Sequence, residues 1–153
     1  MTVLKKRNVT VDSNVLIAYI VSKRENTVIA KVIEKSTNED KLMLTDVIYD
    51  ECIRYATKPR SRVTKKEAEA KLKKISPEII KISPVPPNKE LMKLYKIRDR
   101  GDLKILYSAE ITNSVIIVTQ DKDFSDVEGV RATIMNPKEY VFEKVNNKKV
   151  KSE

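Results

Sequence analysis

Short apolar runs alternate along the chain with longer segments in which apolar residues recur at helical spacing. The apolar runs predict β-strands at residues 9–12, 42–44, 79–82, 115–118 and 132–135. The segments with helical spacing predict helices at residues 14–21, 27–35, 47–55, 64–74 and 102–112, a helix capped by Asn88, and one that begins at Pro137. Uniformly apolar strands separated by helices indicate an α/β fold, a three-layer α/β/α sandwich with a central, mainly parallel sheet.

Local signals set several of the expected boundaries. Thr64 and Glu67 have the spacing of a capping box and predict the start of a helix. The polar, proline-containing segment 56–64 predicts a loop, and the prolines within 84–87 predict a linker. Gly101 predicts an interruption just before the helix at 102–112.

Acidic residues follow two of the strongest strands. Asp12 comes directly after the first apolar run, and Asp121 and Asp123 follow the run at 115–118. Ligands of open parallel sheets bind beyond the carboxyl ends of the strands, so these side chains are candidates for a functional site. Each also has a simpler explanation, because Asp is common at helix N-caps and in turns.

Two further carboxylates lie on predicted helices. Glu51 flanks the apolar stripe of its helix, and Asp102 opens the helix at 102–112. Taken singly, Asp102 suits the positive end of a helix dipole and needs no other role. If all these acids converge, their mutual repulsion requires a divalent cation. Such an ion polarises a phosphodiester and activates a water molecule to attack it.

Composition narrows the choice of metal. The chain has 153 residues, no histidine and one cysteine, Cys52, so an internal disulfide and any site built on histidines or several cysteines are excluded. Oxygen ligands remain, and these suit Mg²⁺ or Mn²⁺. The length predicts one domain at residues 1–143, followed by a basic, flexible tail at 144–153.

The charge balance favours a polyanionic partner. The chain carries 31 basic and 22 acidic residues, and the segment from 54 to 74 alone holds nine basic and two acidic ones. The alternative is an ordinary solvated helix face. The candidate nucleic-acid-binding residues are Arg54, Lys58, Arg60, Arg62, Lys65 and Lys66. With no long apolar run and no signal peptide, we expect a soluble, cytoplasmic protein with no membrane partner.

The order and spacing of these motifs resemble a known family. The matching pieces are Val11-Asp12-Ser13-Asn14, Glu51, Asp102 and Thr119-Gln120-Asp121-Lys122-Asp123-Phe124. Together they resemble the PIN-domain nucleases, most closely the VapC type of toxin ribonuclease, over about residues 9–141.

The resemblance implies a Mg²⁺ or Mn²⁺ site for RNA hydrolysis. Its core ligands would be Asp12, Glu51, Asp102 and Asp121, with Asp123 as a further ligand and with Asn14 and Thr119 as supporting polar groups. The resemblance also implies a metal-dependent endoribonuclease that acts as the toxin of a toxin–antitoxin pair, with an RNA substrate, a small antitoxin protein as partner and a homodimeric state. The alternative is a nucleic-acid-binding module of the same fold that does not cleave.

Overall fold

The computed structural model describes residues 5–22, 27–85, 93, 100–122, 124, 127 and 129–143. The predicted helix capped by Asn88, the candidate ligand Asp123 and the predicted tail at 144–153 lie outside these residues. No helix within the described part is long and apolar enough to cross a membrane.

The centre of the molecule is a parallel sheet of short, apolar strands. Its strands are β1 (Asn8–Val11), β2 (Lys41–Leu42), β3 (Ile116–Val118) and β4 (Thr133–Met135), hydrogen-bonded in the order β2-β1-β3-β4. Val11 of β1 is paired with Val118 of β3. The two central strands therefore end side by side, and the residues after them, Asp12 and Thr119, are placed together.

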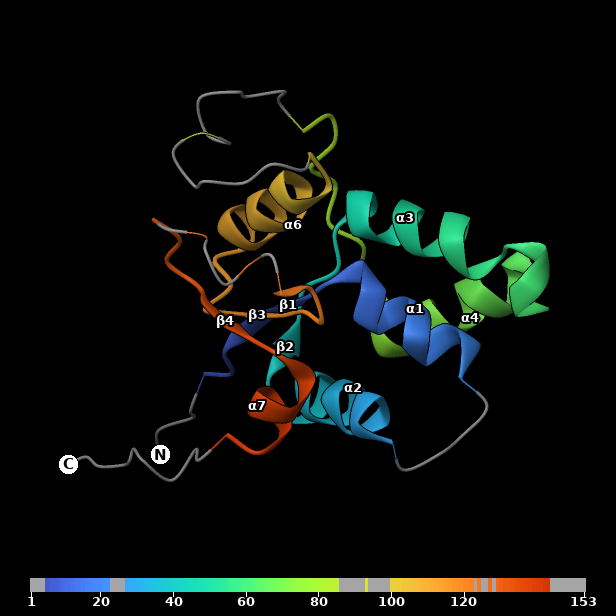
Figure 1. Ribbon diagram of the computed structural model, residues 1–153, viewed down its shortest axis with the longest axis horizontal. Helices are drawn as coiled ribbons and strands as arrows, with labels where there is room; N and C mark the ends of the chain where they lie inside the picture. The colour runs from blue at the N-terminus through green and yellow to red at the C-terminus, as the bar shows by residue number, and fades with distance from the viewer. Residues whose placement is uncertain are drawn as a thin grey trace.

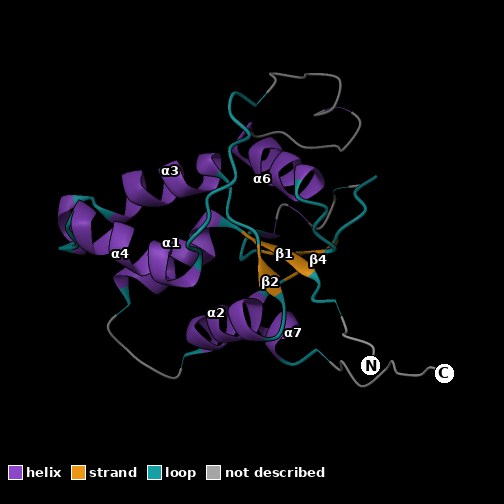
Figure 2. Cartoon of the chain, turned by 180° about the vertical axis from the view of Figure 1, so that it is seen from behind, coloured by secondary structure: helices purple, strands orange, loops and turns teal. Residues whose placement is uncertain are grey.

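Helices cover both faces of the sheet, which confirms the predicted α/β fold (Figure 1). The helices are α1 (Ser13–Val21), α2 (Val28–Asn38), α3 (Asp46–Ala56), α4 (Lys65–Ile75), α6 (Arg100–Ile111) and α7 (Pro137–Val141), with a 3₁₀ turn at Pro59–Ser61. α6 lies on one side of the sheet, and α2 and α7 lie on the other. α1, α3 and α4 pack together beside it, as the opposite view also shows (Figure 2).

Capping residues fix two helix starts where the sequence places them. The Thr64 hydroxyl accepts a hydrogen bond from the Glu67 amide at 3.1 Å, and the Glu67 carboxylate accepts one from the Thr64 amide at 3.1 Å. Asn136 and Glu139 form the same reciprocal pair at the start of α7. Each pair satisfies two helix-end amides that would otherwise need water.

Two local predictions were wrong. Residues 79–82 do not form a strand. Ile80 makes a single β-bridge to Thr45, and the backbone amides that follow it are hydrogen-bonded to the side chain of Asp46 and not to another strand. The Asp46 carboxylate accepts hydrogen bonds from the amides of Ile82 and Ser83 at 2.9 and 3.2 Å. Gly101 does not mark a break before the helix, because it is the second residue of α6. A glycine costs only about 1 kcal/mol even in the interior of a helix, so it is compatible with the first turn of α6.

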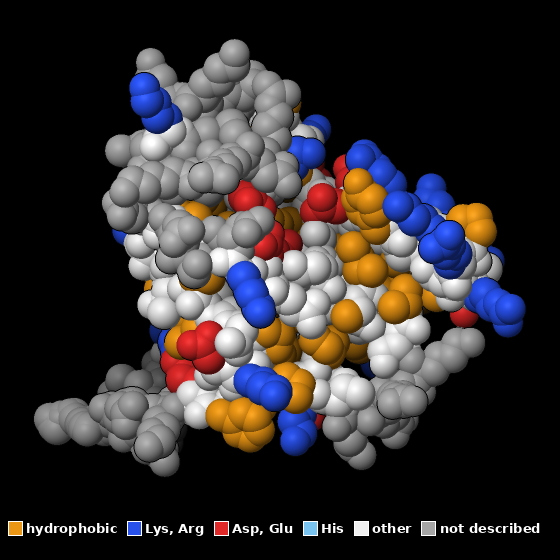
Figure 3. Space-filling view, in the orientation of Figure 1, with side chains coloured by type: hydrophobic (Ala, Val, Ile, Leu, Met, Phe, Trp, Pro, Cys, Tyr) orange, Lys and Arg blue, Asp and Glu red, His pale blue; other side chains and the backbone are white. Residues whose placement is uncertain are grey.

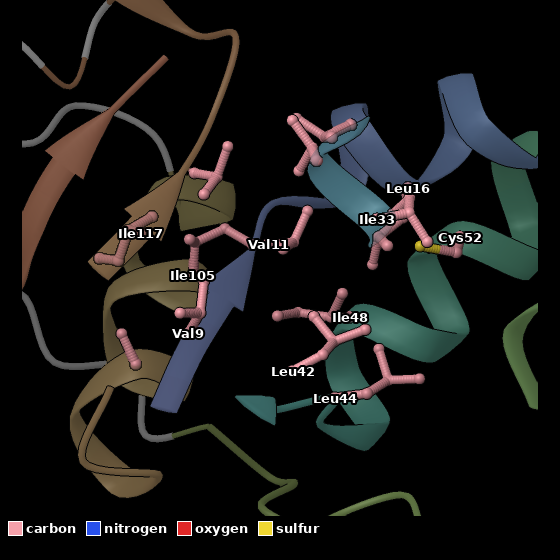
Figure 4. Packing of buried hydrophobic residues seen from close by; sticks show 14 of the residues in the cluster. Val9, Val11, Leu16, Ile33, Leu42, Leu44, Ile48, Cys52, Ile105 and Ile117 are labelled. Atoms are coloured by element: carbon pink, nitrogen blue, oxygen red, sulfur yellow. The ribbon is translucent and has the colours of Figure 1, made fainter. Parts of the chain in front are cut away.

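The hydrophobic core lies between the sheet and the surrounding helices (Figure 4). It is built from the apolar faces that the sequence pattern marks, including Val9, Val11, Leu16, Ile33, Leu42, Leu44, Ile48, Cys52, Ile105 and Ile117. Strands and helices that are far apart in sequence meet in this one core. α1 begins two residues after β1 ends, and α3 packs against α1.

A second, charged cluster ties β1 and α2 to the end of α7. The Arg7 guanidinium donates to Asp40 at 3.0 Å and to Glu143 at 2.9 Å. The buried Lys35 ammonium donates to Glu143 at 3.0 Å and to the Tyr140 carbonyl at 2.7 Å, and the Tyr140 hydroxyl donates to Asp40 at 2.6 Å. The cluster joins the two ends of the described chain, because Arg7 lies near its start and Glu143 at its end.

Candidate functional site

Asp12 is buried at the point where β1 becomes α1. Its amide donates to the Val118 carbonyl at 2.8 Å, which continues the β1–β3 pairing by one residue. It occupies the N-cap position of α1, but its side chain makes no capping hydrogen bond, so the simpler structural explanation does not account for the carboxylate. Only 6% of the residue is exposed. Burying a carboxylate is costly unless something compensates its charge.

Neutral donors surround this carboxylate. The Thr119 hydroxyl donates to Asp12 Oδ2 at 2.6 Å, and the Asn14 amide nitrogen approaches the same oxygen at 3.3 Å. The Asn14 side-chain oxygen in turn accepts from the Gln120 amide at 3.3 Å. Asn14 and Thr119 thus both hydrogen-bond the Asp12 side chain, and their supporting role at a metal site stays a prediction of the family resemblance.

Ser13 joins Asp12 to Glu51. Its hydroxyl donates to Glu51 Oε2 at 2.5 Å and lies 3.3 Å from Asp12 Oδ1. A hydroxyl has one proton, so the short contact identifies Glu51 as the acceptor. The bond brings α3 against the start of α1 and places two carboxylates around one hydroxyl. Ser13 was not among the predicted site residues.

The two carboxylates influence each other electrostatically. Burial raises the pKa of Asp12, the hydrogen bond from Thr119 lowers it, and the charge of Glu51 raises it further. Burial also raises the pKa of the nearby Cys52 thiol, and the charges of Glu51 and Asp12 add to that effect. An acid in this environment binds either a proton or a cation more readily than an exposed acid does.

For the predicted ligands Asp121 and Asp102, the structure gives their positions in the fold. The Asp121 amide donates a hydrogen bond to the Thr119 hydroxyl at 3.0 Å, and the same hydroxyl donates to Asp12. Thr119 therefore links the backbone of Asp121 to the Asp12 carboxylate. Asp102 lies in the first turn of α6, a helix that packs beside α3. Among the described residues, no three acidic or cysteine side chains form a group able to hold a metal ion. The four-carboxylate site therefore stays a prediction. Acidic side chains do gather on the face between α6 and α3 (Figure 3).

The basic segment is exposed and lies next to this site in the chain. All six candidate nucleic-acid-binding residues are exposed, at the end of α3, in the 3₁₀ turn and at the start of α4: Arg54, Lys58, Arg60, Arg62, Lys65 and Lys66. Blue side chains accordingly cover the surface over α3 and α4 (Figure 3). Lys71 differs from these residues. Its ammonium donates to the carbonyls of Ile20 at 2.9 Å and Tyr19 at 3.4 Å, at the end of α1.

Comparison with known families decides the identity of the fold. The model of the PIN domain matches residues 9–130, which is most of the chain. The chain belongs to the PIN-domain family. The match runs from β1 to the segment after β3, so it includes Asp12, Glu51, Asp102 and Asp121 at the order and spacing described above.

A solved structure supports this assignment. The PIN domain described here is similar to VapBC2 from Rickettsia felis bound to a DNA fragment from their promoter, with a TM-score of 0.55. The match covers 84% of this chain and 98% of that one, at 16% sequence identity. At this identity the likeness shows a shared VapC-like fold. No curated protein sequence matched the chain.

Ser13 is the site residue of this PIN domain that sequence reasoning missed. A hydroxyl directly after a strand-ending Asp is a weak signal, because serine is equally common in helix first turns. Its role becomes visible only through Glu51, which is 38 residues away and reaches it by the packing of α3 against α1.

Proposed function

We propose that this PIN domain is a metal-dependent endoribonuclease. The observation that carries the proposal is the buried carboxylate of Asp12, linked through Ser13 to Glu51 at the carboxyl end of the sheet. The exposed basic surface of α3 and α4 continues from that site and is suited to RNA phosphates. The family membership supports the same reading.

The donor atoms fit Mg²⁺ or Mn²⁺. Asp12 and Glu51 supply carboxylate oxygens, the ligands that these hard cations prefer. A bound cation would also offset the burial and the repulsion that raise the pKa of Asp12. Asp102 and Asp121, with Asp123 as a further ligand, would complete the coordination. The ion would supply an activated water molecule and stabilise charge on the phosphate.

Other residues of the chain would orient the two carboxylates and bind the RNA. Thr119, Asn14 and Ser13 hold the two carboxylates in fixed orientations, so little rearrangement is needed when a cation and a phosphate arrive. The basic residues at the end of α3 would bind phosphates on either side of the cut without reading sequence. RNA is therefore held by its backbone while the acidic site acts on one phosphate.

A cleavage assay tests the proposal. Labelled single-stranded RNA is incubated with wild-type protein and Mn²⁺ or Mg²⁺, and in parallel with EDTA, with Asp12→Asn and with Glu51→Gln. Asp50→Asn is the matched control, because Asp50 is exposed on the same helix. We expect cleavage by wild type and Asp50→Asn, and a loss of about a hundredfold or more in the other three reactions.

A second candidate function predicts a different result. The absence of a three-acid group among the described side chains favours a PIN module that binds RNA without cutting it. In that case all variants bind equally and none cleaves. Equal cleavage by Asp12→Asn and wild type, in a preparation that EDTA does not inhibit, would contradict the metal mechanism and indicate a contaminating nuclease.

We also propose that the protein acts as a toxin held in check by a small antitoxin. The similar structure from R. felis is a toxin–antitoxin complex, which supports this partner class. Expression of wild type should arrest bacterial growth, and Asp12→Asn should not. The predicted homodimer is tested by light scattering of the purified chain. The predicted cytoplasmic location belongs to the same proposal, since that is where such a nuclease meets its RNA.

A further inference from the structure

Tyr55 is exposed beside the acidic site. It is 41% exposed, and the other tyrosines in the described part of the chain are half-buried or buried. The side chain of Tyr49 on the same helix is held instead by Glu69, which accepts a hydrogen bond from its hydroxyl at 3.3 Å. An exposed ring alone indicates no function, so the argument depends on what surrounds Tyr55.

Its place on α3 relates it to Glu51. Residues four apart on a helix lie on the same face, so Tyr55 is just over one turn beyond Glu51, about 6 Å along the axis. Ile48, Cys52 and Ala56 are buried on the adjoining row and fix how α3 is turned. Tyr55 and Glu51 therefore lie on the same face of α3, about one helical turn apart.

A lysine contacts the ring. The Lys58 ammonium lies 4.4 Å from the centre of the Tyr55 ring, and Arg54, the residue before it, is exposed. An exposed contact between a lysine and an aromatic ring is weak, so a stacking base can replace the lysine. The freed ammonium would then lie beside the phosphate of the same nucleotide. Exposed aromatic rings combined with basic side chains are typical of single-stranded nucleic-acid sites.

We propose that Tyr55 is a stacking platform for the RNA base next to the phosphate held at the Asp12–Glu51 site. This inference extends the proposed ribonuclease function to its substrate, which must then be single-stranded around the cut. Bases in a duplex are already stacked on one another and cannot reach the ring. Stacking tolerates all four bases, so the platform would fix the position of the strand and not its sequence.

Fluorescence offers a direct test, because the chain has no tryptophan. Tyr55→Trp introduces a single reporter, and short single-stranded RNA is titrated in EDTA so that no cleavage can occur. We expect saturable quenching of the tryptophan emission, and much weaker quenching by a duplex of the same length. Unchanged emission at RNA concentrations that saturate binding would overturn the proposal.

Binding measurements on other variants complete the test. Tyr55→Ala should weaken binding of single-stranded RNA by about ten- to a hundredfold, and Tyr55→Phe should bind like wild type, since the ring is kept. Phe142→Ala, which removes a 66% exposed ring at the end of α7, is the matched control and should change nothing. Tyr55→Ala binding as tightly as wild type would refute the platform.

The outcome is separable from that of the nuclease proposal. Quenching and a loss of binding in Tyr55→Ala, without cleavage in Mn²⁺, would support the platform and refute the nuclease. Metal-dependent cleavage that Tyr55→Ala leaves unaltered would support the nuclease and refute the platform. Urea unfolding of each variant confirms that the exposed substitution leaves the fold intact.

Discussion

Glu143 carries a prediction about how acid unfolds this protein. Its carboxylate accepts hydrogen bonds from Arg7 at 2.9 Å and from Lys35 at 3.0 Å, and its side chain is 19% exposed. Replacing it with glutamine removes the negative charge and keeps the shape. Arg7 still pairs with Asp40, and Lys35 still donates to the Tyr140 carbonyl, so the substitution strands neither cation.

The expected loss of stability can be bounded from the lowered pKa of the Glu143 carboxyl group. The hydrogen bond from Arg7 is the main reason that the pKa of Glu143 falls from 4.5 to about 2. A gap of about 2.5 pH units corresponds to about 3 kcal/mol at most. Arg7 is 35% exposed, so water screens part of the interaction. We therefore expect Glu143→Gln to lower the free energy of unfolding by about 1–2 kcal/mol at neutral pH.

The sign of the pH dependence is fixed by the same values. The pKa of Glu143 is lower in the folded state than in the unfolded state, so ionisation favours folding. Its contribution is complete above about pH 5 and disappears as the pH falls towards about 2. The difference in stability between wild type and Glu143→Gln should shrink across that window, because glutamine does not titrate.

Urea unfolding followed by circular dichroism at a series of pH values measures this difference. Glu34→Gln, an exposed change on α2, is the control and should stay within about 0.5 kcal/mol of wild type throughout. A Glu143→Gln deficit that remains constant between neutral pH and about pH 2 would show that the pair contributes by packing and not by charge.

One chemical modification and two sets of substitutions test other parts of the structure. Cys52 is fully buried and its thiol pKa is raised by that burial, so a thiol reagent at about pH 8 should modify it only as fast as the protein unfolds. Thr64→Ala should cost about 1 kcal/mol in urea unfolding through the lost cap, and Thr64→Ser should restore most of it. Lys71→Met should cost about 1–2 kcal/mol because the carbonyls ending α1 lose their donor, whereas the exposed Lys73→Met on the same helix should be neutral.

Local patterns predict the fold well where the determinant is local. The β-branched run at β3 and the capping box of Thr64 need only neighbouring residues, and both elements form where expected. Residues 79–82 have a similar apolar pattern, yet a strand also needs a partner along its length. Asp46 takes the amides of Ile82 and Ser83 instead, and no local signal in the segment reveals this competitor.

The candidate site follows the same division. The sequence placed Asp12 and Thr119 at the same edge of the sheet, because each follows a predicted parallel strand, but their direct contact depends on β1 and β3 being neighbours, which only the structure shows. The link from Ser13 to Glu51 depends on how α3 packs against α1, which the sequence does not specify locally. The charged cluster of Arg7 is harder still, since its contact with Glu143 spans 136 residues.

Among the described residues, two groupings of acids each contain a buried carboxylate, Asp40 in one and Asp12 in the other, and the contrast between them supports the proposed ligand at one. Asp40 and Glu143 are neutralised by Arg7 and Lys35, and the pKa of Glu143 is lowered by those hydrogen bonds. The described hydrogen bonds to Asp12 and Glu51 come from the neutral side chains Ser13, Asn14 and Thr119, and the pKa of Asp12 is raised. Neutral donors orient a carboxylate but leave its charge uncompensated. Described cations pair with the acids of the first grouping, whereas no described lysine or arginine forms an ion pair with the second, which supports the proposed divalent cation there.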